Sequence, residues 1–192
     1  MNNRHLLSPT SARIFGTDTA EERLFLAALQ HPAILLDNFA YIYDPPTRRH
    51  MRFLLWDWQW KLLAELTQHK RVIILKARQL GVSWLLAGYA LWTALSRPNS
   101  NILLISSKEK VASDLLAKCQ YMFRYLPAQL RPPRDGKDRN NDTLLAFGAI
   151  NSKISALAST KESGRSEAAT LVIPDEWAFH PDAADMYSSY EP

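Results

Sequence analysis

The feature that most constrains this chain is residues 71–83, RVIILKARQLGVS, where an apolar strand pattern passes through a short polar loop into a helical pattern. This order places backbone N–H groups at a helix N-terminus, which is a binding site for phosphate. This segment can be aligned with the phosphate-loop motif G-x-x-x-x-G-K-[ST]. Lys76 then replaces the first glycine and Val82 replaces the lysine, whereas Gly81 and Ser83 match the second glycine and the hydroxyl residue. The segment therefore predicts a phosphate loop whose lysine has moved.

The loop contains the groups that phosphate binding requires. Lys76 and Arg78 are its cations. Gly81 permits close approach of the backbone, and Ser83 offers a hydroxyl to Mg²⁺. The alternative is an ordinary strand and helix with basic residues at the turn. The expected nucleotide-binding residues are Lys76, Ala77, Arg78, Gln79, Leu80, Gly81, Val82 and Ser83.

A second group of chemical interest is LVIPDEWAF, in which an apolar strand runs into Asp175 and Glu176. In a parallel sheet, ligands lie outside the carboxyl ends of the strands, so both acids are expected on the same edge as the loop. Asp175 could then hold Mg²⁺, and Glu176 could position or deprotonate the attacking water. The alternative is a solvated helix start capped by the aspartate.

The remaining sequence predicts alternating strands and helices. After a loose arm at residues 1–19, helices are expected at 20–30, where His31-Pro32 ends the first one, and at 56–68, 82–95 and 109–125. Strands are expected at 71–75, 101–105, 143–147, 153–157 and 170–173, with an exposed loop at 126–142. Strand, helix, strand and helix in succession predict a parallel sheet with right-handed crossovers.

Composition limits the class of protein. The single Cys119 excludes an internal disulfide and a cysteine-rich metal site. A net charge of +4 favours polyanionic partners without identifying one. No apolar run approaches the roughly 18 residues that span a bilayer, so we expect a soluble protein of the cytoplasm without membrane partners.

The loop and the acids together resemble the large terminase subunits of tailed bacteriophages and prophages, over about residues 40–192. That family often has the loop [KR]-x-R-Q-x-G-x-[ST], which KARQLGVS matches, and its acidic strand is an apolar run, Asp-Glu and often Ala-Phe, as in LVI-P-DE-W-AF. The resemblance implies that Lys76 replaces the usual phosphate-contacting lysine and that Arg78 approaches the γ-phosphate.

Three further sites follow from the resemblance. Gln59 resembles the glutamine that recognises the adenine edge, the alternative being a surface glutamine on an amphipathic helix. Arg165 resembles the arginine that some terminases insert into a neighbouring subunit's ATP site, the alternative being a solvated loop arginine. Ser106, Ser107 and Lys108 resemble a helicase-like motif that supports the site or faces DNA, the alternative for Lys108 being a charge at a helix start.

The resemblance implies a three-layer P-loop NTPase of the RecA/ASCE type, with a mostly parallel central sheet and Walker A and Walker B motifs. A helical segment at 1–50 would precede an ATPase domain at 51–192. Such a domain hydrolyses ATP with Mg²⁺ to translocate double-stranded DNA into a capsid in the bacterial host cytoplasm. The implied partners are DNA, the portal protein and the small terminase subunit, and a homo-oligomeric ring is allowed.

The sequence also departs from the family. Pro174 replaces the usual apolar residue before the acids, which predicts that the strand ends one residue early. The chain stops before the expected coupling motif and nuclease domain, which predicts an incomplete ATPase domain and slow turnover. Two other functions stay open: a helicase-like ATPase, and a catalytically impaired prophage fragment that acts only as a binding protein.

Overall fold

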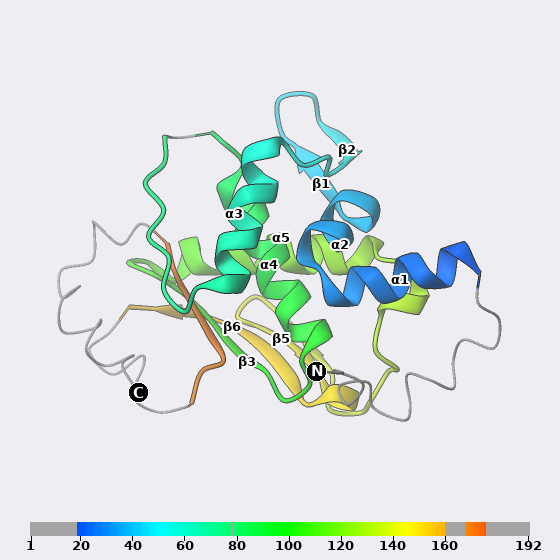
Figure 1. Cartoon of the computed structure of the whole chain (residues 1–192). Helices are drawn as coiled ribbons and strands as arrows, with labels where there is room; N and C mark the ends of the chain where they lie inside the picture. Colours follow the sequence, from blue (N-terminus) through cyan, green and yellow to red (C-terminus); the bar gives the residue numbers. More distant parts are fainter. Residues whose placement is uncertain (1–18, 78, 160–167, 176–192) are drawn as a thin grey trace.

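A computed structural model describes residues 19–77, 79–159 and 168–175 (Figure 1). In these ranges the chain forms a small hairpin, five α-helices and a five-stranded sheet. Two short 3₁₀ helices, η2 and η3, occupy Ala128–Leu130 and Gly148–Ile150. None of the described helices combines the length and the apolar character needed to cross a bilayer.

Two short helices open the described part of the chain. Helix α1 (Ala20–Gln30) was predicted, and it begins with a capping box in which the Glu22 amide donates to Thr19 Oγ1 at 3.2 Å. Helix α2 (Pro32–Phe39) was not predicted, because His31-Pro32 was interpreted only as a stop. Proline is favoured at the first position of a helix, where its missing N–H has no partner to lose. The same dipeptide therefore ends α1 and begins α2.

A hairpin and a third helix follow. Strands β1 (Tyr41–Asp44) and β2 (Arg49–Arg52) pair antiparallel around the turn at residues 45–48. Helix α3 (Asp57–Gln68) agrees with the predicted helix at 56–68 to within one residue. The hairpin was not predicted, because each strand has only four residues and lacks a buried, alternating apolar face.

The main sheet is mixed, with strand order β4-β5-β6-β3-β7. Strands β3 (Asn101–Ser106), β6 (Ser152–Ala158) and β7 (Leu171–Pro174) run parallel, with β3 in the centre. Strands β4 (Arg139–Asn140) and β5 (Leu144–Phe147) add an antiparallel edge. The parallel part of the prediction is confirmed for these three strands. Strand β7 includes Pro174, paired with Ile105, so the predicted early end of this strand is wrong.

The helices gather on one side of the sheet (Figure 1). Helices α4 (Val82–Ser96) and α5 (Glu109–Tyr125) have the predicted positions and pack against each other and against β6. Ile102, Leu104 and Ile173 point from the sheet into this main core, which also includes Phe25 and Leu35 from α1 and α2. On the opposite face, Leu103 and Ile105 form a second, small cluster. The described elements thus make two layers rather than the expected three.

The predicted strand at residues 71–75 is wrong. Residues 71–77 form no helix or strand, and no pairing joins them to the sheet in the part of the chain that the structure describes. Ile73 and Leu75 are 98% and 101% exposed, whereas Ile74 packs against the main core. The exposure of the side chains alternates along this segment as it does along a strand. A strand becomes part of a sheet, however, only through hydrogen bonds with a neighbouring strand.

Candidate phosphate-binding site

The predicted phosphate loop forms a tight turn into α4. Gln79 and Gly81 have positive φ angles of 63° and 73°, and Gly81 is the N-cap of α4. Glycine adopts this left-handed conformation without steric cost, whereas a side chain there is strained. Among the described residues, no side chain caps the α4 N-terminus. Its first N–H groups are therefore available to an anion, and the helix dipole adds partial positive charge.

Val82 and Ser83 show why the lysine is not at its usual place. Val82 is 3% exposed and belongs to the main core, so a charged side chain at this position would be buried. Ser83 is half-buried, while Lys76 and Ala77 are exposed. Among the described residues of the loop, Lys76 at its start is thus a cation exposed to solvent.

Gln59 lies behind the loop. It is 3% exposed, which contradicts the alternative of a surface glutamine. Its Oε1 accepts a hydrogen bond from the Trp56 amide at 3.0 Å, and its Nε2 lies 3.5 Å from the position that a Cβ on Gly81 would occupy. The glutamine thus joins the start of α3 to the turn that begins α4. Its amide oxygen is engaged by the protein, and its Nε2 faces the loop.

The carboxyl ends of β3 and β7 place two polar residues side by side. The Asp175 amide donates to the Ile105 carbonyl at 2.8 Å, which continues the parallel pairing by one residue. Ser106 ends β3, is fully buried, and its Oγ has no hydrogen-bond partner among the described residues. A buried hydroxyl without a partner is unusual and marks a place that a polar ligand or water can satisfy.

Chain connectivity places the loop and these residues at one edge. Helix α4 ends at Ser96, and after four connecting residues the chain enters β3 and runs back across the sheet. The start of α4 therefore lies toward the carboxyl end of β3, and α4 also contacts β7. Parallel strands with a helix start above their carboxyl ends form the usual ligand crevice of an α/β sheet.

The structure leaves part of the predicted site undescribed. Arg78, Arg165 and Glu176 lie outside the described residues. Ser107 and Lys108 come directly after Ser106, so they lie at the same edge of the sheet. Lys108 is exposed and is the N-cap of α5. Within the described ranges, no group of three His, Cys, Asp or Glu side chains is arranged to hold a metal. A hydroxyl and one carboxylate are nevertheless a donor set that Mg²⁺ uses together with phosphates and water.

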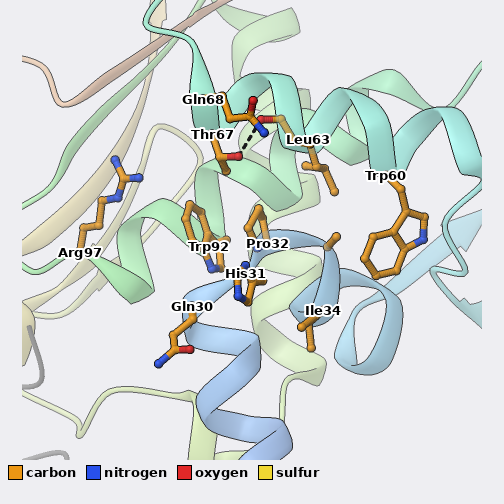
Figure 2. Close-up of a pocket in the computed structure, with 12 residues that line it drawn as sticks. Gln30, His31, Pro32, Ile34, Trp60, Leu63, Thr67, Gln68, Trp92 and Arg97 are labelled. Carbon is orange, nitrogen blue, oxygen red and sulfur yellow. Dashed lines mark hydrogen bonds between the residues drawn. The ribbon is translucent and has the colours of Figure 1, made fainter. Parts of the chain in front are cut away.

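A groove of about 640 Å³ lies elsewhere, between the α1–α2 junction, α3 and the end of α4 (Figure 2). Trp60 and Leu63 reach it from α3, and Trp92 and Arg97 come from the far end of α4. None of the predicted site residues lines it. Because α4 is about 22 Å long, this groove is separate from the phosphate loop. The sequence contained no signal for it, since its residues come from three separate segments.

A comparison with families of known proteins finds a match for this chain. A family model described as "Terminase large subunit, T4likevirus-type, N-terminal" matches residues 73–189, which is more than half of the chain. The matched region includes the phosphate loop, Ser106 and Asp175, and it excludes Gln59 and the β1–β2 hairpin. No curated protein matches the chain.

Proposed function

The chain belongs to the family of T4-like terminase large subunits, in their N-terminal region, which implies a role in bacteriophage DNA packaging, and we propose that it is the ATPase motor domain of the packaging machine. In this proposal the domain binds ATP with Mg²⁺ and uses hydrolysis to move double-stranded DNA. It would work in the host cytoplasm with the portal protein and the small terminase subunit.

One observation carries the proposal: the left-handed turn at Gly81 begins α4 at the sheet edge where Asp175 lies beside Ser106, whose Oγ has no partner among the described residues. The α4 N-terminus would hold the phosphates, and Lys76 would add the mobile cation. The buried Val82 favours a terminase over a helicase-like ATPase, for which a lysine would be expected at this position.

Further roles in the proposal rest on residue chemistry. Ser83 and Asp175 would hold Mg²⁺, which when bound draws charge from the β- and γ-phosphates. Glu176 follows Asp175 directly and would orient the attacking water. Arg78 would stabilise charge on the transferring phosphoryl group, and Arg165 would do so in a neighbouring subunit's site. Gln59 would present its Nε2, which faces the loop, to an acceptor on the nucleotide.

Calorimetry with ATP and Mg²⁺ tests the displaced lysine. Lys76→Ala should weaken binding by about tenfold or more, because a charge-assisted contact to phosphate is lost. Lys70→Ala is the matched control, since it removes an exposed lysine just upstream of the loop. Equal affinity in the wild type and Lys76→Ala would remove the central argument for this phosphate site.

A second proposal concerns turnover. Because residues 71–77 are not held by sheet hydrogen bonds, the start of the loop lacks the rigid strand that would fix Lys76 against the phosphates. We propose that the chain binds ATP but hydrolyses it slowly. Steady-state phosphate release should be low in the wild type and lower still in Asp175→Asn. Hydrolysis at the rate of an intact terminase, lost in Glu176→Gln, would contradict this.

A further inference from the structure

The β1–β2 hairpin presents an aromatic face to α5. The register pairs Tyr41 with Arg52 and Tyr43 with His50, and because side chains alternate along a strand, these four residues share one face. The rings of Tyr41 and His50 stack with centroids 4.4 Å apart and an interplanar angle of 5°. One side of the hairpin is therefore a platform of rings.

Helix α5 completes this platform. Tyr121 and Tyr125 lie one turn apart, so they point the same way. The Tyr125 ring centroid is 4.2 Å from that of His50, and His50 Nδ1 shares a hydrogen bond of 2.8 Å with the Tyr121 hydroxyl. We use the term aromatic cluster for Tyr41, Tyr43, His50, Tyr121 and Tyr125.

The cluster is not simply a core between the hairpin and the helix. Tyr43 and Tyr125 are 40% and 41% exposed, and His50 is also exposed. Tyr41 and Tyr121 are half-buried, so the packing of the hairpin on α5 leaves part of each ring system in contact with solvent. An exposed group of rings of this kind marks a surface that contacts another molecule.

Positive charge surrounds the rings. The hairpin, residues 41–52, contains three arginines and one aspartate. Arg52 is engaged, because its guanidinium donates to the carbonyls of Asp37 and Asn38 at the end of α2. Arg48 is exposed at the turn, whereas Arg49 begins β2 opposite Asp44 and lies on the face away from the rings. In the described ranges, neither forms an ion pair with a carboxylate.

Arg124 adds charge from the α5 side. Partial burial raises the pKa of Tyr121, as do the neighbouring Tyr125 and Tyr43, whereas Arg124 lowers it. Arg124 is thus close enough to act on a ring of the cluster, and it is itself exposed. Lys118 contributes a further cation, with its Nζ 5.8 Å from the ring of Trp84, which in turn meets Tyr121 edge-on.

We infer that the aromatic cluster and its arginines form a binding surface for single-stranded nucleic acid. Exposed rings stack on unpaired bases, and arginines contact the phosphates between them. A duplex hides the faces of its bases in its own stack, so it could use only the charges. The inference is independent of ATP hydrolysis, and the hairpin lies outside the residues matched by the family model.

Fluorescence anisotropy with the full chain and a labelled oligothymidylate of about 20 nucleotides tests the surface over a range of salt concentrations. The chain should bind this strand more tightly than a duplex of the same length and more tightly than an abasic strand with the same number of phosphates. Equal affinity for all three probes would reduce the site to a nonspecific charge effect and overturn the inference.

Two pairs of charge variants locate the phosphate contacts. Arg48→Ala with Arg124→Ala should lower the slope of log affinity against log salt by about 1 to 1.5, since each single-strand phosphate contact contributes about 0.7. Arg134→Ala with Lys137→Ala removes the same charge from the exposed loop after α5 and should leave the slope unchanged. Equal losses in both pairs would contradict a localised surface.

Tyr43 separates stacking from charge. Tyr43→Ala should weaken oligothymidylate binding by about tenfold, whereas Tyr43→Phe retains the ring and should bind as the wild type does. Thermal melting of both variants checks that they still fold. As a further control, Asp175→Asn, at the phosphate site, should bind the oligothymidylate as the wild type does. Unchanged binding by a folded Tyr43→Ala would overturn the role of the cluster, whatever the outcome for ATP.

Discussion

Helix α4 and the segment just before it, residues 71–77, are both rich in apolar residues but lie in opposite environments. Twelve residues of α4 are buried, and its neighbours include α1, α2, α5 and the sheet. In the preceding segment, Ile73 and Leu75 are almost completely exposed. Apolar composition alone therefore does not decide burial.

The difference comes from backbone hydrogen bonds. A helix satisfies its own N–H and C=O groups, so α4 can enter the core as a complete unit. A strand satisfies its groups only beside another strand, and burial without that partner leaves polar groups unpaired at a cost of about 1–3 kcal/mol each. Residues 71–77 pair with no strand of the described sheet, and of their side chains Ile74 packs against the main core.

The largest expected effect tests this contrast directly. Val82→Lys should lower the free energy of unfolding by about 3–5 kcal/mol, because it places an uncompensated charge in the core. Ile73→Lys also replaces a β-branched apolar residue by lysine, nine residues earlier. It should change the free energy of unfolding by no more than about 0.5 kcal/mol, because this side chain is already in water. Urea denaturation of both variants measures the difference.

A large loss of stability in Ile73→Lys would mean that this residue is buried in solution and that the segment pairs with another strand. A stable Val82→Lys with improved ATP binding would show that position 82 opens onto the loop. Either result would remove the contrast between the two regions.

The second prediction concerns the contact between α4 and α5. Cys119 is fully buried, and its Sγ donates to the Ala87 carbonyl of α4 at 3.3 Å. Burial raises the pKa of this thiol from 9.0 to about 12. The folded state holds the proton that the unfolded state loses, so the contribution to stability is complete below pH 9 and is lost as the pH rises toward 12.

Between pH 8 and pH 10.5, the thiol should lower the unfolding free energy by about 2 kcal/mol. Cys119→Ser lacks this titration, so urea denaturation of the two proteins at both pH values isolates the effect of the thiol from other groups. Parallel losses of stability in the wild type and the serine variant would show that the thiol is accessible to solvent.

The smallest effect concerns the approach of α2 to α4. A methyl group on Gly88 would overlap both methyl groups of Leu36, which is fully buried. Gly88→Ala gains about 1 kcal/mol of helix propensity, but overpacking costs about 1–3 kcal/mol, so we expect a net loss of about 1 kcal/mol in thermal or urea unfolding. A stabilised variant would mean that α2 moves easily away from α4. In a Leu36→Ala background, where the overlap is removed, Gly88→Ala should instead stabilise the protein by up to about 1 kcal/mol.

Much of the fold could be predicted from the sequence. Helices α1, α3, α4 and α5 have strong 3.6-residue or continuous apolar patterns, and each matches its predicted range closely. Strands β3, β5, β6 and β7 were also found, because short apolar runs lie between turn residues. Helix α2 and the hairpin were missed, since Pro32 can end or begin a helix and the hairpin strands lack a core-facing pattern.

The candidate site was predicted in part. The turn at Gly81, the exposed Lys76 and the position of Asp175 beside Ser106 agree with the motif interpretation. The contact of Gln59 with the loop could not be derived from residue types, because two helices separated by the segment before α4 must first pack together. The aromatic cluster was missed for the same reason, since its rings come from the hairpin and α5.

The sequence by itself determined the elements whose hydrogen bonds are local, the glycine turn with its displaced lysine, and the order of loop and acids along the chain. Only the tertiary structure decided that RVIIL remains outside the sheet, that Val82 is a core residue and that Gln59 is buried behind the loop. The physical reason is that strand pairing and side-chain burial depend on distant neighbours, whereas helix and turn formation depend on nearby ones.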